Sequence, residues 1–414
     1  MKILIYSANF SPEPTGIGKY SGEMAAWLVE RGHAVRVVAA PPYYPAWRID
    51  SEYRWPPFQR ESWQGMEVWR APLWVPKAPR GLTRMLHLLS FAVSSFPLML
   101  RQLGWRPDVV LTVAPAFMCA PAGLLTARLC GAKAWLHLQD FEVDVAFGMG
   151  LLKGSLLRRI ALRMERATLR RFDVVSTISH RMVERLLLKG VSAERTRYFP
   201  NWVDVARIRP LHTPSAYRST LGIAPEAVVA LFSGTLGGKQ GLMVIPEAAA
   251  LLAARRDIVF VVCGDGVMKA RLEQAAAGLP NLRLLPLQPA ERLDELLRMA
   301  DVHLMPQSPD AADLVLPSKL TGMLASGRPV IATCRAGTEI SEIVARCGLV
   351  VPPDDGLALA AAVRRFADDP AMGAELGRRA RSIAESDFER HSTLHRVFGT
   401  LEGEPAGVVD DAVA

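Results

Sequence analysis

The chain has 414 residues, of which 50% are hydrophobic and 22% are charged, and its formal net charge is +8. This length and composition exclude a disordered chain and a single small domain, and they favour two domains with large apolar cores. The five cysteines form no Cys-x-x-Cys pair, so a disulfide framework and a cysteine zinc site are not expected.

Short apolar runs alternate with amphipathic helical patterns along the chain, which predicts an α/β fold with parallel sheets. The first run, at 3–6, is too short for a signal peptide and is expected to be a strand. A loop over 12–19 and a helix over 20–31 follow it, and residues 41–80 show little periodicity and are expected to form a long ordered insertion. Further strands of this half are predicted at 34–39, 109–113, 133–138, 173–177 and 197–200.

The loop after the first strand contains the sequence Gly16-Ile17-Gly18-Lys19. It resembles part of a dinucleotide-binding fingerprint, but it lacks the third glycine and the acidic residue expected at the end of the second strand. A loop that closes over a ligand is therefore favoured over NAD binding. Gly16 and Gly18 are the candidate ligand contacts.

Charge is spread unevenly. Residues 1–200 hold 27 Lys and Arg against 15 Asp and Glu, which gives +12, and the remainder holds 22 against 26, which gives −4. A helix is predicted at 151–171, and the stretch 151–173 that contains it carries seven basic and two acidic residues, a net +5. This pattern predicts an anionic membrane surface as a partner. A basic surface that contacts only water is the alternative, and a nucleic-acid partner is disfavoured because aromatic side chains do not alternate with the basic ones.

Residues 85–100 form an apolar segment that adds to the membrane prediction. As a helix these 16 residues would reach only about 24 Å, short of the ~30 Å hydrocarbon core, and Pro97 is expected to interrupt it. An interfacial or buried helix is favoured over a spanning one.

Polar side chains gather where the strand 133–138 ends, at His137, Asp140, Glu142 and Asp144. Because the carboxyl ends of parallel strands border the ligand site in such folds, His137 and Asp140 are candidate catalytic residues. They suit the positioning of a hydroxyl group or the transfer of a proton. The alternative is a helix-capping Asp140 beside a histidine at the edge of the core.

A second series of strands follows an irregular, proline-bearing linker at 201–225. Its strands are predicted at 228–232, 258–263, 282–286, 302–306, 330–333 and 349–351. We therefore predict an N-terminal domain at 1–205, onto which a C-terminal helix at 385–402 packs back. A second domain is predicted at 206–384, and a disordered tail at 403–414.

Three loops of the second series are suited to a diphosphate. A glycine-rich loop that is not a Walker A motif follows the strand 228–232, and a Gly-Asp-Gly loop follows the next strand. A Pro-Ser-Lys sequence is expected to begin a helix, with Ser318 as its cap or in its first turn. Three such loops at the ends of parallel strands predict one ligand site held by lysines and helix N-termini. For each loop alone, an ordinary glycine-rich turn is the alternative. The candidate ligand-binding residues are Gly234, Lys239, Gly264, Gly266, Ser318 and Lys319.

Taken together, these motifs resemble the retaining glycosyltransferases of family 4, and in particular those of colanic acid and O-antigen synthesis. The resemblance extends over about residues 1–400. It implies the GT-B fold, with two Rossmann-like βαβ domains facing an interdomain cleft. The motifs that carry it are Tyr6–Tyr20, Phe232–Gly241, Gly264–Gly266, Pro317–Val330 and Glu339–Val344.

The resemblance implies sugar transfer from a nucleotide diphosphate sugar, with retention of the anomeric configuration and without a bound metal or other cofactor. The implied acceptor is a glycan linked to polyprenyl diphosphate. The enzyme would then be cytoplasmic and peripheral on the inner face of the cytoplasmic membrane, with no nucleic acid as partner.

The resemblance also implies roles for single residues. Lys239 would contact the donor diphosphate, Gly16 and Gly18 would lie under the reacting sugar, His137 would lie near the donor sugar, and Glu342 would join the donor-binding residues. A nucleotide-sugar epimerase on the same fold is the alternative function. It would need acidic and histidine side chains placed to abstract a proton from the sugar.

The chain departs from the family pattern at two places. Thr235 and Leu236 stand where an arginine is usual, and the usual pair of glutamates is missing, with Leu314 and Gly322 at its positions. We therefore expect Ser318 and Lys319 to take over part of the anion binding.

Overall fold

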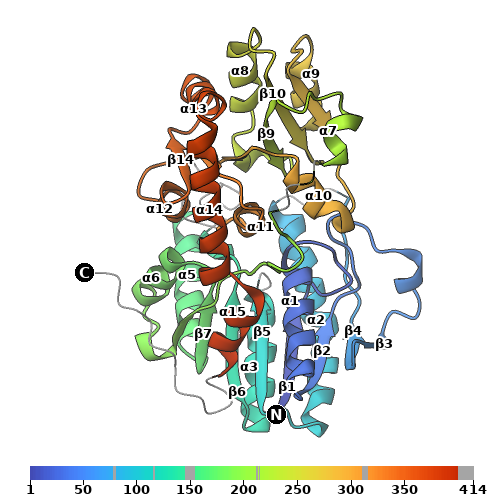
Figure 1. Ribbon diagram of the computed structural model, residues 1–414. Coiled ribbons are helices and arrows are strands. Elements are labelled where there is room, and N and C mark those ends of the chain that lie inside the picture. Colours follow the sequence, from blue (N-terminus) through green and yellow to red (C-terminus); the bar gives the residue numbers. More distant parts are fainter. Residues whose placement is uncertain are drawn as a thin grey trace. The chain divides into compact units, whose positions relative to one another are not determined.

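The computed structural model describes residues 1–77, 81–114, 117–144, 154–210, 213, 215–309 and 316–399. The chain divides into two compact units. In each unit, helices cover both faces of a largely parallel β-sheet, as Figure 1 shows. The predicted α/β class with two Rossmann-like sheets is thereby confirmed.

The two units do not follow the chain as two simple halves. Unit 1 contains Met1–Pro200 and Arg396–Ala414, and unit 2 contains Asn201–His395. The chain therefore returns to unit 1 within its last described helix, α15 (Arg390–Phe398). The sequence predicted that the N-terminal domain ends at 205 and that a helix beginning at 385 packs back onto it.

The sheet of unit 1 has eight strands in the order β3-β4-β2-β1-β5-β6-β7-β8. All neighbours pair in parallel except β3 and β4. The strands are β1 (Lys2–Ser7), β2 (Ala34–Ala39), β3 (Gln59–Trp63), β4 (Met66–Arg70), β5 (Val109–Ala114), β6 (Lys133–Leu138), β7 (Val174–Thr177) and β8 (Thr196–Tyr198). The central strands β1, β5 and β6 are buried almost throughout, because helices cover both of their faces.

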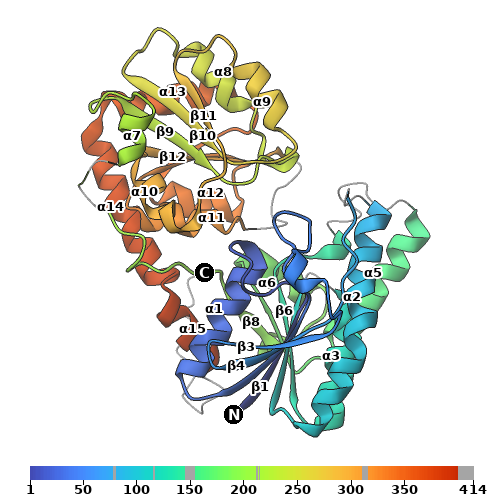
Figure 2. The same ribbon diagram turned by 90° about the vertical axis from the view of Figure 1, so that its right-hand side faces the viewer.

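Helices lie on both sides of this sheet, and Figure 2 shows α1 and α15 on one face and α2 and α3 on the other. On the α2 face, the rings of Tyr6 and Phe91 are 5.7 Å apart between centroids. On the α15 face, Phe398 packs against Trp135 at 5.1 Å and against Trp27 of α1 at 6.2 Å. The described helices of this unit are α1 (Gly16–Glu30), α2 (Gly81–Arg101), α3 (Ala120–Cys130), α5 (Ser155–Leu169) and α6 (His180–Leu188).

Residues 59–70 form a hairpin that the sequence analysis missed. Its strands β3 and β4 are joined by Gln64 and Gly65, whose φ angles are 44° and 79°. Two successive residues with positive φ are typical of a two-residue hairpin turn, because that turn matches the twist of the strands. The predicted ordered insertion at 41–80 thus contains two strands that were not predicted.

Helix α2 also differs from its prediction. It has 21 residues and contains Pro97 in its interior, so it is about 32 Å long. Pro97 cannot donate to the carbonyl of Val93, but Val93 is 66% exposed and water can take the place of the missing donor. By length and composition alone, the helix at Thr83–Gly104 is long and apolar enough to cross a membrane. Its inner side nevertheless packs on the sheet, with Phe91 and Met99 fully buried.

The sheet of unit 2 has six parallel strands in the order β11-β10-β9-β12-β13-β14. They are β9 (Val228–Ser233), β10 (Ile258–Cys263), β11 (Leu282–Leu285), β12 (Val302–Pro306), β13 (Val330–Thr333) and β14 (Gly348–Val351). These bounds lie within one residue of the predicted ones. The order reverses between β9 and β12, and in such sheets ligands bind beyond the carboxyl ends of the strands at this switch point.

Helices cover this second sheet on both faces. Phe232 and Phe260 pack with α8 and α13 on one face, and Leu231 and Val261 pack with α7 and α10 on the other. The described helices of unit 2 are α7 (Ala216–Thr220), α8 (Val244–Leu251), α9 (Lys269–Ala276), α10 (Leu293–Arg298), α11 (Lys319–Ala325), α12 (Glu339–Ala345), α13 (Gly356–Asp368) and α14 (Pro370–Asp387).

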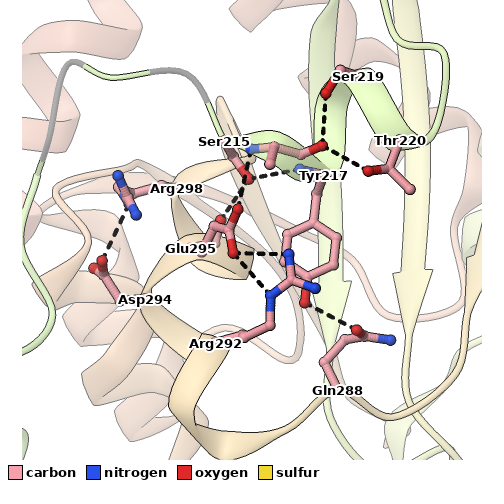
Figure 3. A network of polar contacts seen from close by, with 10 residues as sticks. Ser215, Tyr217, Ser219, Thr220, Gln288, Arg292, Asp294, Glu295 and Arg298 are labelled. Carbon is pink, nitrogen blue, oxygen red and sulfur yellow. Dashed lines mark hydrogen bonds and ion pairs between the residues drawn. The ribbon is translucent and has the colours of Figure 1, made fainter.

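The entry into unit 2 is fixed by polar contacts between α7 and the segment that leads into α10, which Figure 3 shows. Ser215 caps α7 and donates from its hydroxyl to the carbonyl of Glu295, at 2.8 Å. The Tyr217 hydroxyl donates to Gln288 at 2.9 Å, and the Arg292 guanidinium lies 4.3 Å from the centre of the Tyr217 ring. These contacts join the start of the unit to α10, beside the sheet that carries the predicted ligand loops.

Candidate active site

The loops that follow β9 and β10 lie side by side at the carboxyl edge of the second sheet. The backbone N–H of Gly234 donates to the carbonyl of Cys263 at 3.0 Å, and that of Leu236 donates to the carbonyl of Asp265 at 2.8 Å. The structure therefore brings the first two predicted loops together. A cavity of about 170 Å³ lies beside them, and its lining includes Leu236, Gly264 and Lys269.

Gly264 and Gly266 lie against the backbone of the loop that follows β9. A β-carbon on Gly264 would overlap the carbonyl oxygen of Gly234, and one on Gly266 would lie 2.5 Å from the carbonyl oxygen of Leu236. The missing side chains thus make room for the backbone of the first loop. Contact of these glycines with a ligand stays a prediction.

The side chain of Lys319 contacts the loop that follows β9. Its amine lies 3.8 Å from the centre of the Phe232 ring, and its side chain passes Gly234, where a β-carbon would be 3.4 Å from Lys319 Cδ. Burial lowers the pKa of Lys319 to about 7, because it removes water from the charged form. The lysine is therefore poised to change charge near neutral pH, and a bound anion would favour its protonated form.

Ser318 stands at the N-cap position of α11, but its side chain makes no capping hydrogen bond. Its backbone is already helical, with φ of −59° and ψ of −20°, whereas a capping serine is usually extended. Of the two expected places, the capping role is therefore wrong, and the backbone angles put Ser318 at the start of the first turn. Gly322 in the same helix faces apolar side chains, with Leu297 and Ile208 at 3.6 and 3.7 Å from its β-carbon position, and a family glutamate there would lie in an apolar contact.

Two further predicted residues are placed only in part. Lys239 belongs to the short 3-10 helix Gly238–Gln240 after β9, and its side chain lies outside the described part, as does Leu314. Glu342 lies exposed in α12, which Thr338 caps by accepting from the backbone N–H of Ser341 at 3.3 Å. Roles of Lys239 and Glu342 in donor binding stay predictions.

In unit 1, Gly16 and Gly18 lie in the first turn of α1, which begins four residues before the predicted start at Tyr20. The N-cap residue Thr15 has extended backbone angles, with φ of −141° and ψ of 165°. The two glycines therefore present backbone N–H groups at a helix N-terminus beyond β1, at the ligand edge of this sheet.

His137 differs from its prediction. It is 3% exposed, and both of its ring nitrogens have protein partners. The amide nitrogen of Gln139 lies 2.9 Å from Nε2, so the proton is on Nδ1, which donates to Ser176 Oγ at 2.9 Å. Burial lowers the pKa of His137 to about 3. The imidazole is therefore neutral and engaged within the protein, which does not suit the predicted proton transfer or the binding of a sugar hydroxyl.

The carboxyl groups beyond β6 differ in their partners. Asp140 is half-buried directly after the strand, and Asp144 is tied to Lys189 by an ion pair of 2.9 Å. Glu142 Oε2 accepts from the backbone N–H of Phe117 at 2.8 Å, and burial raises the pKa of Glu142 to about 7. Glu142 belongs to the predicted cluster but was not a candidate catalytic residue, and the contact that distinguishes it comes from Phe117, 25 positions earlier in the chain.

The described residues contain no group of three His, Cys, Asp or Glu side chains placed to hold a metal ion. Positive charge at the ligand edge of unit 2 comes instead from Lys319 beside Gly234. The arrangement is chemically suited to an anionic ligand that contacts the β9 loop.

Comparisons with known proteins agree with this geometry. The Glycosyl transferase 4-like domain matches residues 15–202, and the domain Glycosyl transferases group 1 matches residues 227–369. The putative colanic acid biosynthesis glycosyl transferase WcaI of Escherichia coli K12 is 42% identical over 97% of this chain and 100% of its own length.

Solved structures share the fold over nearly the whole chain. Sucrose-phosphate synthase from Thermosynechococcus elongatus superposes with a TM-score of 0.73 at 17% identity, covering 97% of this chain and 98% of its own. HepE from Anabaena, solved in complex with UDP-glucose, gives a TM-score of 0.69 at 18% identity over 98% of this chain and all of its own. The predicted GT-B fold is confirmed, and nothing in these comparisons supports an epimerase. The similarity to WcaI over both matched domains shows that this chain belongs to family 4 of the glycosyltransferases.

Proposed function

We propose that this glycosyltransferase moves a sugar from a nucleotide diphosphate sugar to a lipid-linked glycan, with retention of the anomeric configuration, in the synthesis of an extracellular polysaccharide. The observation that carries the proposal is the full-length similarity to WcaI, whose name assigns it to colanic acid synthesis. The fold shared with HepE, which binds UDP-glucose, supports the class of donor.

The donor is proposed to bind unit 2. The diphosphate would lie against the β9 loop at Gly234, with Lys319 and Lys239 supplying positive charge. A charged hydrogen bond of this kind contributes about 1.5–3 kcal/mol. The cavity beside Gly264 has apolar walls, among them Val262 and Leu272, and is the proposed place of the base.

The proposed reaction is a substitution on one face of the sugar. The bond from the anomeric carbon to the diphosphate oxygen breaks, and a bond to the acceptor oxygen forms on the same face. The leaving diphosphate takes the acceptor proton, and the lysines stabilise its negative charge without a metal. Glu142 is a weaker candidate for a covalent route, because a carboxyl with a pKa of about 7 is partly protonated and is a poor nucleophile at neutral pH.

Attachment to the membrane is proposed through the outer side of α2. The exposed apolar residues of this side follow one another at intervals of three and four positions, which places them in one stripe along the helix. They are Leu86, Leu89, Val93, Phe96 and Leu100. Helix α5 adds exposed arginines, among them Arg158 and Arg159, next to exposed Leu156 and Ile160. Apolar insertion together with basic charge suits the cytoplasmic face of an anionic bilayer, where a polyprenyl-linked acceptor would be found.

The test is a transfer assay with purified protein, a panel of UDP- and GDP-sugars and a polyprenyl-diphosphate-linked acceptor. Proton NMR of the product is expected to show the same anomeric configuration as the donor, and added EDTA is expected to leave the rate unchanged. An inverted product, or activity lost with EDTA and restored by a divalent cation, would overturn the respective part of the proposal. Conversion of a nucleotide sugar without any acceptor would favour an epimerase instead.

A further inference from the structure

Glu13 is a buried carboxylate to which the reaction above assigns no role. It is 3% exposed and lies in the loop between β1 and α1. Its Oε1 accepts from the backbone N–H groups of Tyr43 and Tyr44, at 3.2 and 3.0 Å, and its Oε2 accepts from the amide of Asn9 at 2.9 Å. The carboxylate thus joins the β1–α1 loop to the segment that follows β2.

The Glu13 side chain lies in the space that a side chain at position 18 would occupy. A β-carbon on Gly18 would overlap Glu13 Oε2 and would lie 2.6 Å from Glu13 Cβ. The φ angle of Gly18 is not in the left-handed region, so its backbone conformation does not by itself demand glycine. The space left by the missing side chain is occupied by Glu13, not by the ligand that the sequence suggested.

A buried cation, Arg70, makes further contacts to the same loop. Arg70 of β4 is fully buried, and its guanidinium donates to the carbonyl of Ser11 at 2.5 Å and to that of Ala40 at 2.9 Å, while Glu61 of β3 balances its charge. Arg70 is also the cation whose charge acts on Glu13. Glu13 and Arg70 therefore both join the β1–α1 loop to the segment that follows β2.

We infer that Glu13 is a positioning residue, which holds the first turn of α1, with its ligand-facing backbone at Gly16, in the conformation that transfer requires. Gly18 is a glycine because Glu13 occupies its side-chain space. The structural part of this inference stands on contacts alone. The effect on transfer rests on the proposed function of the loop.

The charge of Glu13 matters because its hydrogen-bonding partners named above are all donors. Burial raises the pKa of Glu13 to about 6, against the hydrogen bonds and the Arg70 charge that lower it. Arg70, Tyr43 and Tyr44 are the charged or titratable groups around it, and burial raises the pKa of the Tyr43 hydroxyl above its usual value. Protonation would place an O–H donor among N–H donors and loosen the loop. Transfer should therefore fall as pH drops through about 6.

The first experiment compares Glu13→Gln with the matched control Glu30→Gln, at the exposed end of α1. The glutamine resembles the protonated acid, so its kcat/KM for the acceptor should be about tenfold lower at pH 7.5 and should lack the fall of the wild type below about pH 6. Glu13→Asp, which keeps the charge, should retain the acid limb. Affinity for UDP and GDP, which lack the sugar, should stay unchanged in all variants, which separates this result from a failure of the proposed donor site.

The second experiment does not depend on activity. Hydrogen exchange at the amides of Tyr43 and Tyr44 should be faster in Glu13→Gln than in the wild type, and unchanged in Glu30→Gln. Gly18→Ala should lower the melting temperature of the wild type but not that of Glu13→Gly, which removes the opposing β-carbon as well. Gly104→Ala, at an open position, is the control.

Either of two results would overturn the inference. One is an equal loss of stability from Gly18→Ala in both backgrounds. The other is a Glu13→Gln enzyme whose pH profile and amide exchange match those of the wild type.

Discussion

The positive charge of the candidate site depends on pH through one side chain, Lys319. Its amine lies over Phe232 and beside Gly234, and burial lowers its pKa to about 7. We predict that the affinity for a nucleoside diphosphate falls as pH rises through 7, because the amine loses its charge. Calorimetric titration with UDP and GDP between pH 6 and 8.5 measures this dependence.

Replacement of the same lysine provides the control for that titration. Lys319→Met should weaken binding at pH 6 by about tenfold or more, as expected for a lost charged hydrogen bond, and should flatten the dependence on pH. Lys133→Met, at the amino end of β6 and exposed, should behave as the wild type. Equal affinities of Lys319→Met and wild type at pH 6 would rule out the anion-binding role.

Lys319 also predicts how stability depends on pH. The pKa of this lysine is about 7 in the folded protein and 10.5 in the reference state, so between these values the unfolded chain binds the extra proton. The free energy of unfolding should therefore rise with pH from about 7 toward 10 by this contribution. Urea unfolding of unit 2 should show this rise in the wild type and lose it in Lys319→Met. An unchanged slope in that variant would assign the titration to another group.

The sequence does not predict which side chains contact each other. His137 and Gly18 were recognised as unusual residues at strand ends, and both do lie at the expected edge. Their partners were not foreseen, because Ser176 is 39 positions from His137 and the Glu13 carboxylate reaches Gly18 across a turn. Contacts of this kind depend on side-chain directions in three dimensions, whereas apolar periodicity reports only which face a residue occupies.

At the scale of elements, apolar runs predicted the strands of the second sheet to within one residue, since buried parallel strands are continuously apolar. Predictions failed where local signals conflicted with packing. Pro97 suggested a break, but α2 continues because the carbonyl without a donor belongs to the exposed Val93. The hairpin at 59–70 was missed because its edge strand alternates between partly buried and exposed residues with little apolar content.

The outer stripe of α2 leads to a prediction about membrane binding. Val93 and Phe96 are 66% and 39% exposed, and each should lose about 1.5–3 kcal/mol of insertion energy when changed to Asp. Sedimentation with vesicles rich in phosphatidylglycerol should show binding about tenfold to a hundredfold weaker for each variant, with little change in the melting temperature. Leu357→Asp, at a site 71% exposed on α13, is the matched control. Equal vesicle binding by Val93→Asp, Phe96→Asp and the control would exclude α2 as the docking element.

At the scale of the whole molecule, the path of the chain makes the two units unequal. Unit 1 is completed by the end of α15, where Phe398 is 1% exposed and packs on Trp135 and Trp27. Its ring also meets Phe199, which lies 4.6 Å from the ring of His137. The stability of the first unit, and the setting of His137, therefore depend on residues almost at the other end of the described chain.

This dependence gives a prediction that separates the units. Phe398→Ala should destabilise unit 1 by about 3–5 kcal/mol, the usual range for a buried phenylalanine, and Phe366→Ala, at 4% exposure in the core of unit 2, should destabilise unit 2. Tryptophan fluorescence can tell them apart, since of the nine tryptophans only Trp202 lies in unit 2. In urea, Phe398→Ala should shift the fluorescence transition to lower concentration, whereas Phe366→Ala should shift mainly the loss of helical circular dichroism. Two variants that shift both signals together would show that the units unfold as one cooperative body, because separate transitions are the mark of independent domains.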